Sequence, residues 1–171
     1  DVCSSDLAPH LRMYKAFPSE GGTRATAFIR LPVRDSKQPE VVREMLTVRD
    51  LLPTLVDFLD IPLSPPVETQ IVGHSFLPLI TEDGGIFEGA ERPVVIEFLG
   101  KLSVRQGNWK LLKLPPPYGQ DAFALYDLNA DLAERHNLAD DHPQVVERLL
   151  SLYEKYKQTY GVIEPDWVSG Y

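Results

Sequence analysis

The sequence predicts an α/β fold in two parts that divide near residue 90. Before that point, strand-like and helix-like runs of apolar residues follow one another. After it, four strand-like runs with short turns precede one long amphipathic helix, an order typical of an antiparallel sheet packed on a helix. With 43% hydrophobic and 25% charged residues, the 171-residue chain has the composition of a globular protein.

The first part holds two predicted strands and two predicted helices. Residues 25–31 and 45–48 have the composition of short strands. Asp50 is placed to cap a helix whose leucines and valine recur at helical spacing up to about residue 60. A short helix is predicted over 76–80. These few elements cannot form a parallel sheet with both faces covered, so we expect this part to be the end of a larger domain.

The second part contains the clearest periodic patterns. Glycine-containing turns separate the first three strand-like runs, which favours an antiparallel meander. The predicted strands are 94–99, 101–106, 109–114 and 122–128. A helix is predicted to begin at Pro143, to bury a face that includes Leu149 and Tyr153, and to end at Gly161 as its C-cap.

Charge and cysteine content exclude several functions. The net charge of −8 and the absence of a basic stripe argue against a nucleic-acid partner. The apolar runs are far shorter than a membrane span. A single cysteine, Cys3, excludes an internal disulfide framework and a cysteine zinc cluster.

Taken residue by residue, the chain shows little catalytic chemistry. It has no serine nucleophile elbow and no phosphate-binding glycine loop. The histidines at 10, 74, 136 and 142 are scattered and are predicted to be surface or loop residues. Asp127, Asp131 and Glu134 are predicted to form a solvated turn and a helix start. Asp140 and Asp141 are expected to stabilise the N-terminus of the following helix.

Six strings, in order and at compatible spacing, resemble one protein family. They are residues 14–24, 50–57, 73–79, 104–111, 125–128 and 134–139. Together they resemble the C-terminal third of sulfatases of the bacterial arylsulfatase type, in the alkaline phosphatase superfamily. The resemblance covers about residues 8–161.

The resemblance implies a division into domains. Residues 8–90 would be the C-terminal end of the α/β catalytic domain, and 91–171 a C-terminal α+β subdomain with a four-stranded antiparallel sheet packed on helix 143–160. Residues 1–7 resemble a translated sequencing-adapter remnant of metagenomic reading frames and are predicted to be a non-native leader.

The resemblance also implies an activity. Sulfatases cleave sulfate esters with a formylglycine nucleophile and a divalent cation, usually Ca²⁺, whose oxygen ligands suit that ion. Those ligands and the nucleophile are expected in a missing N-terminal sulfatase region, so the chain is predicted to be an inactive fragment by itself. Two alternatives stay open: a phosphonate or phosphate monoester hydrolase of the same superfamily, and a non-catalytic interaction module. The substrate, compartment and oligomeric state are left open.

One residue maps onto the family's sulfate site. Lys15 stands five residues before the turn formed by Glu20, Gly21 and Gly22, where the family has a lysine that contacts the sulfate and the leaving group. Arg24 matches a family position near this turn and is predicted to orient it. Cys3 lacks the surrounding nucleophile motif, and Ser5-Asp6 lacks the asparagine of the metal motif, so neither is predicted to act. The proline loop 114–119 is predicted to be a plain surface loop.

Overall fold

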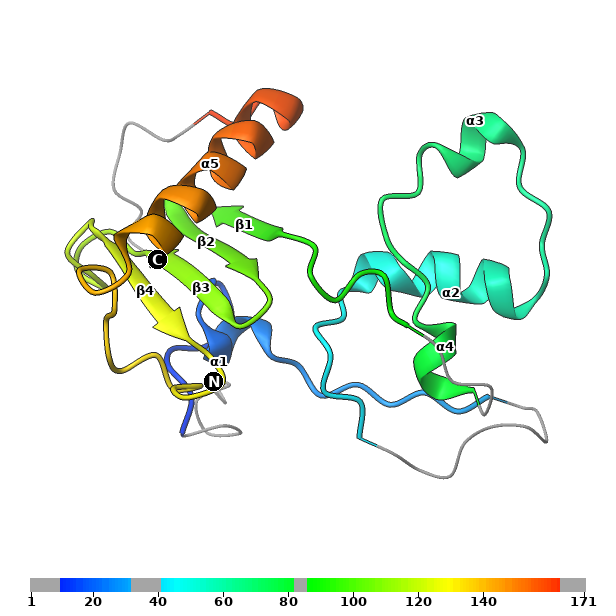
Figure 1. The fold of residues 1–171 in the computed structure, drawn as a ribbon, viewed down its shortest axis with the longest axis horizontal. Helices are drawn as coiled ribbons and strands as arrows, with labels where there is room; N and C mark the ends of the chain where they lie inside the picture. Colours follow the sequence, from blue (N-terminus) through cyan, green and yellow to red (C-terminus); the bar gives the residue numbers. More distant parts are fainter. Residues whose placement is uncertain (1–9, 32–40, 82–85, 164–171) are drawn as a thin grey trace. The chain divides into compact units, whose positions relative to one another are not determined.

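The computed structural model describes residues 10–31, 41–81 and 86–163 (Figure 1). The chain forms two compact units. One unit joins the residues up to Thr26 with those from Pro93 onward, and the other is Ala27–Arg92. This grouping places the segment around Lys15 with the C-terminal sheet. The assignment of 8–90 and 91–171 to family domains stays a prediction.

The sheet has four antiparallel strands in the order β1-β2-β3-β4, which confirms the predicted meander. The strands are β1 Val94–Phe98, β2 Lys101–Gln106, β3 Trp109–Lys113 and β4 Phe123–Asp127. Val104 of β2 pairs with Val95 of β1 and with Leu111 of β3. Leu99 and Gly100, which join β1 to β2, both have positive φ, as a two-residue hairpin turn that matches the strand twist requires.

Helix α5, Pro143–Tyr160, covers one face of this sheet, mainly over β2 and β3 (Figure 1). Leu149 and Tyr153 enter a core that alternate residues of the strands complete, as the period of two requires. The buried strand residues of this core are Leu102, Val104, Leu111 and Leu125. Gly161 adopts the left-handed conformation, and its N–H donates to the Lys157 carbonyl at 2.9 Å. The predicted helix and its glycine C-cap are therefore confirmed.

The opposite face of the sheet is covered by the N-terminal segment. Phe17 packs against Leu112 and Tyr126, with Leu114 and Leu128 in the same buried cluster. The segment ends in the one-turn helix α1, Glu20–Thr23, where the sequence indicated only a turn. Residues far apart in the chain thus close the second core of this unit.

The other unit consists of short helices: η2 Val48–Asp50, α2 Leu51–Phe58, α3 Pro65–Glu68 and α4 Leu77–Ile80. The predicted helices over 50–60 and 76–80 are confirmed. Asp50 stands before α2 as expected, but its carboxylate does not cap that helix. It accepts the Thr47 N–H at 2.6 Å and the His74 N–H at 3.0 Å, and it pairs with Arg92. Asp50 therefore ties three segments together, and its pKa stays below its ordinary value because these bonds outweigh its burial.

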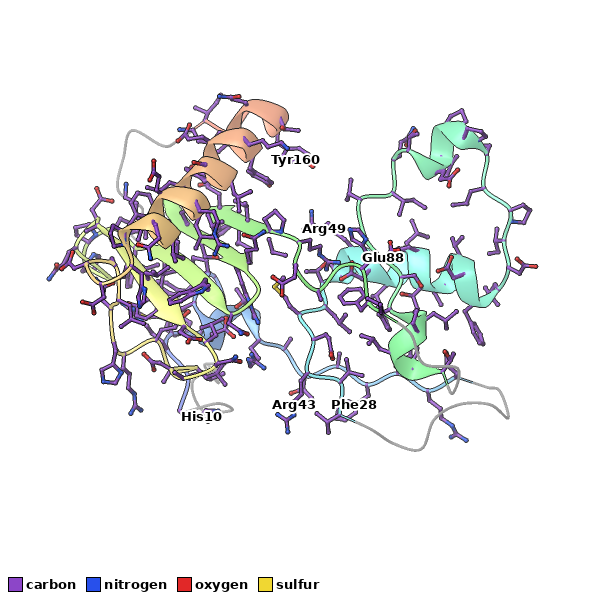
Figure 2. The ribbon with its side chains drawn as sticks, viewed as in Figure 1. His10, Phe28, Arg43, Arg49, Glu88 and Tyr160 are labelled. Atoms are coloured by element: carbon purple, nitrogen blue, oxygen red, sulfur yellow. The ribbon has the colours of Figure 1, made fainter. Side chains whose placement is uncertain are left out.

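Two predicted strands are wrong. Residues 25–31 have no strand pairing in the described structure, and the Phe28 side chain is 95% exposed (Figure 2). A strand needs a neighbour to accept its backbone hydrogen bonds, and the described residues supply none there. Residues 45–47 are also irregular, and Val48 begins η2. That turn forms because Thr47 and Asp50 make a reciprocal capping box.

Among the described residues, no helix combines the length and apolar character needed to cross a membrane.

Candidate functional site

Residues 12–21, here called the Lys15 loop, form a closed loop on the sheet. The Gly21 N–H donates to the Arg12 carbonyl at 2.9 Å, and the Ser19 hydroxyl donates to the same oxygen at 3.0 Å. Inside the loop, the Phe17 N–H donates to the Tyr14 carbonyl at 3.1 Å. The ends of the loop are therefore joined by direct hydrogen bonds.

Both glycines of α1 are required by the close approach of this helix to the loop. A Cβ on Gly21 would lie 2.2 Å from the Met13 carbonyl oxygen. A Cβ on Gly22 would lie 2.1 Å from the Phe17 carbonyl oxygen. Any larger residue would push α1 off the loop backbone, so glycine at these two positions has a direct steric cause.

Lys15 lies exposed on the loop, while the residues beside it are anchored. The rings of Tyr14 and Phe17 pack edge to face at 5.1 Å, and Phe17 packs on Tyr118 at 4.7 Å. Arg12 donates to the Tyr126 hydroxyl at 2.8 Å. The loop thus combines an exposed ammonium group with a fixed backbone.

Three buried charged residues fasten α1 to the sheet, and we call them the buried ion cluster: Glu20, Lys110 and Glu134. The Lys110 Nζ lies 2.8 Å from Glu20 Oε1 and 2.7 Å from Glu134 Oε1. The Glu20 N–H donates to Glu134 Oε2 at 3.2 Å. All three residues are at most 3% exposed. Buried charges are rare unless they are paired, and here one ammonium group serves two carboxylates.

Two arginines add positive charge on the Glu20 side only. The Arg24 Nε lies 3.1 Å from Glu20 Oε2, and the Arg105 Nη1 lies 3.9 Å from the same oxygen. Arg24 is thus bonded to the first residue of α1. Among the described residues, the cation that pairs with Glu134 is Lys110.

This asymmetry shifts the pKa values of the two carboxylates in opposite directions. Burial raises the pKa of Glu20, but Lys110, Arg105 and Arg24 outweigh it and hold that pKa below its ordinary value. Burial also raises the pKa of Glu134, and Lys110 alone does not offset it while the nearby Glu20 charge adds to it. The pKa of Glu134 is therefore above its ordinary value.

The prediction of a solvated acidic turn is wrong for Glu134, and no helix starts there. Asp131 accepts the N–H groups of Arg135 and His136 at 2.6 and 2.7 Å and closes a tight turn instead. Glu134 has a positive φ of 56° in this turn, and its side chain is buried. Sequence reasoning also missed Lys110. A lysine between apolar residues of a central strand was the signal that a buried carboxylate partner exists.

Other candidate residues lie apart from the cluster. Among residues 10–31, 41–81 and 86–163, no three His, Cys, Asp or Glu side chains are grouped as metal ligands. In the proline loop, Pro116 and Pro117 are exposed, while Leu114 is buried in the second core. Cys3 and Ser5-Asp6 lie outside the described residues.

Comparisons with known proteins place these features in a family context. The chain is 28% identical over 163 residues to an uncharacterized sulfatase of Schizosaccharomyces pombe, covering 89% of this chain and 28% of the relative. It is 28% identical over 155 residues to the N-acetylgalactosamine-6-O-sulfatase of Bacteroides thetaiotaomicron, covering 84% of this chain and 29% of that enzyme. The chain therefore spans less than a third of the length of these relatives. No family model matches it.

A solved structure supports the same fold. The crystal structure of Ps i-CgsB matches with a TM-score of 0.50 and 18% identity, over 70% of this chain and 25% of that one. Together with this match, the four-stranded antiparallel sheet and its long helix place the chain in the α/β class. More particularly, the chain is similar in sequence to two sulfatases over 89% and 84% of its length, which supports the resemblance to the C-terminal part of that family.

Proposed function

We propose that this chain is the C-terminal part of a sulfuric ester hydrolase of the arylsulfatase type and that Lys15 contacts its substrate. An ammonium group offers three donors, which suits one oxygen of the sulfate group and the ester oxygen that leaves. Positive charge held at the leaving oxygen lowers the barrier because negative charge develops there in the transition state.

The observation that carries this proposal is the anchored Lys15 loop. The loop is closed at Arg12, and its two glycines stand at the spacing that the sulfatase resemblance requires. A lysine in a loose polar loop would lose much of its interaction energy to ordering, and a fixed backbone reduces that loss. Glu20, Gly21, Gly22 and Arg24 then act as structural residues beside the site.

The proposal gives this chain no metal ligand and no nucleophile. The described residues bring together no group suited to Ca²⁺. In this proposal, the formylglycine and the cation belong to the part of the relatives that this chain does not span. We accordingly expect no turnover from the chain alone.

The unit Ala27–Arg92 supports an N-terminal sulfatase region as the partner. Helix α2 and the residue after it expose four leucines by 47 to 59% of their surface, and Val48 before it is 80% exposed. These leucines are Leu51, Leu52, Leu55 and Leu59. A group of apolar side chains of this size marks a surface that another protein region covers.

A chimaeric enzyme tests the proposal. The chain would replace the matching C-terminal part of the Bacteroides N-acetylgalactosamine-6-O-sulfatase, with folding checked by circular dichroism. We expect hydrolysis of a sulfate ester by the chimaera and none by the isolated chain. Lys15→Ala should lower kcat at least about 100-fold, since a charge that acts on the leaving group contributes on that scale. Lys113→Ala, a lysine on β3 that pairs with Asp121, is the matched control.

Two outcomes would overturn the proposal. If Lys15→Ala and Lys113→Ala leave the same kcat and KM, Lys15 has no contact with the substrate. If the folded chimaera does not hydrolyse the sulfate ester that the unaltered Bacteroides enzyme hydrolyses, the chain does not complete a sulfatase site.

A further inference from the structure

We propose that the buried ion cluster of Glu20, Lys110 and Glu134 is the positioning device of Lys15. This inference rests on the proposed function of Lys15 and assigns three residues that act through the Lys15 loop without touching substrate. The cluster would set where the loop sits on the sheet, and thereby where the Lys15 ammonium group is presented.

The buried ion cluster connects three segments of the chain. Lys110 belongs to the central strand β3, Glu20 begins α1, and Glu134 lies in the turn after β4. One ammonium group therefore joins three segments, two of which are 114 residues apart in the chain. Lys110 and Glu134 thus fix α1 relative to both the strand and the turn.

The buried ion cluster lies next to the hydrogen bond that closes the Lys15 loop. The Glu20 N–H donates to Glu134, and the next N–H along the chain, that of Gly21, donates to the Arg12 carbonyl. Loss of the Glu134 carboxylate would leave the Glu20 N–H without this acceptor in a buried place. The hydrogen bond from the Gly21 N–H to the Arg12 carbonyl, which closes the loop, is one residue away. We therefore expect it to weaken when the bond from the Glu20 N–H to Glu134 is lost.

The buried ion cluster makes a directional contact between the loop and the sheet. Phe17 already supplies apolar packing between the loop and the sheet. Apolar packing is non-directional, whereas a buried ion pair with hydrogen bonds permits only one registration of the partners. The buried ion cluster therefore fixes the orientation of the loop on the sheet, which the packing of Phe17 alone does not fix.

Limited trypsin digestion of the full chain tests this inference, because the Lys15–Ala16 bond is itself a tryptic site. Cleavage of a folded protein follows the population of the locally open state. The rate of cleavage after Lys15 would be followed by mass spectrometry and compared with the rate after Lys155 in α5, on the other face of the sheet. The variants are Lys110→Met, Lys110→Arg and Glu134→Gln, with Lys113→Met on the same strand as the control.

We expect Lys110→Met to raise the rate after Lys15 at least about tenfold relative to the rate after Lys155. Lys110→Arg keeps the charge and should restore most of the protection, which a simple packing role would not predict. Glu134→Gln should give a smaller increase, because the amide oxygen still accepts the Glu20 N–H. Lys113→Met should stay within about twofold of the unchanged chain.

An unchanged rate after Lys15 in Lys110→Met would overturn the inference. So would equal increases after Lys15 and Lys155 in both Lys110→Met and Glu134→Gln, because the cluster would then stabilise the whole unit and not the loop. The proposed function fails separately: a selective opening of the loop, together with a chimaera that is insensitive to Lys15→Ala, would leave the cluster as an anchor and remove Lys15 from catalysis.

Discussion

Lys110 and Glu134 form an ion pair of 2.7 Å between groups that are 2% and 0% exposed in their side chains. The same ammonium group lies 2.8 Å from Glu20, which has two further arginines nearby. The two carboxylates therefore share a cation but differ in their surroundings. This difference sets the sign of their contributions to stability as the pH changes.

Glu134 should make the chain less stable as the pH rises above 4.5, the ordinary pKa of a glutamate. Its pKa is raised by burial in the folded state, so between these two values the folded chain binds the proton more tightly than the unfolded chain. The free energy of unfolding of the unchanged chain, minus that of Glu134→Gln, should therefore grow as the pH falls towards 4.5. The slope has an upper limit of about 1.4 kcal/mol per pH unit.

Urea denaturation at several pH values measures this difference. Glu147→Gln, the same change on the exposed side of α5, is the matched control. A difference between the unchanged chain and Glu134→Gln that shrinks as the pH falls from 7 to 4.5 contradicts the expectation.

Glu20 should show the opposite sign. Its pKa lies below 4.5 in the folded state, because Lys110, Arg105 and Arg24 outweigh its burial. The stability that its carboxylate contributes is complete above pH 4.5 and is lost as the pH falls through the lowered pKa. At pH 7 we expect Glu20→Gln to lose about 3 kcal/mol, since one partner of a buried pair is removed.

Urea denaturation of Glu20→Gln from pH 7 down to pH 3 checks this expectation. The difference from the unchanged chain should diminish below pH 4.5. A constant difference over that range would show that the Glu20 contribution does not depend on its charge.

The sequence predicts the sheet and the C-terminal helix well, because both depend on local patterns. The strand-like runs of β1 to β3 with the turns between them, and the apolar face containing Leu149, are contained in short windows. The second face of the sheet could not be predicted in this way. There an ion pair joins Glu20 to Lys110, 90 residues away, and a hydrogen bond joins the Glu20 N–H to the Glu134 carboxylate, 114 residues away.

The errors have a related cause. Glu134 follows Asp127 and Asp131 in a polar stretch, and composition alone places it in water. Only the lysine that β3 brings to it explains its burial. The strand predicted over 25–31 was wrong because composition alone does not form a strand. A strand also needs a neighbouring strand to pair with, and the composition of 25–31 does not supply one. Lys15 was found by its spacing to Gly21 and Gly22, and the structure supplies the steric reason why those two positions are glycine.

Replacement of Lys101 by methionine should stabilise the chain. Lys101 is 0% exposed, and its Nζ has no hydrogen-bond acceptor among the described residues. The Nζ lies 4.6 Å from the centre of the Phe17 ring and 5.5 Å from that of Tyr118. Burial lowers the pKa of the amine because the charged form is desolvated. A desolvated cation–π contact returns about 2 kcal/mol, less than the several kcal/mol for an unpaired buried charge.

We expect Lys101→Met to raise the free energy of unfolding by about 1 kcal/mol at pH 7, because methionine keeps the packing without the charge. Urea denaturation measures the change, with Lys113→Met as the control for loss of a lysine from the sheet. A loss of stability in Lys101→Met would mean that the contacts with the rings of Phe17, Phe98 and Tyr118 outweigh desolvation.

Gly21 should tolerate no side chain, because the obstacle to a Cβ is backbone. An added Cβ would lie 2.2 Å from the Met13 oxygen and 2.4 Å from the Arg12 oxygen, and neither can rotate away. Gly21→Ala must therefore displace α1 from the Lys15 loop and break the bond from the Gly21 N–H to Arg12. We expect a loss of about 3 kcal/mol in urea denaturation.

Gly161→Ala is the matched control, since Gly161 has a φ of 65° but open space around it. That change should lose only about 1 kcal/mol of conformational energy. Equal losses in the two variants would mean that α1 can move away from the loop carbonyls without strain. The steric requirement for glycine at position 21 would then be wrong.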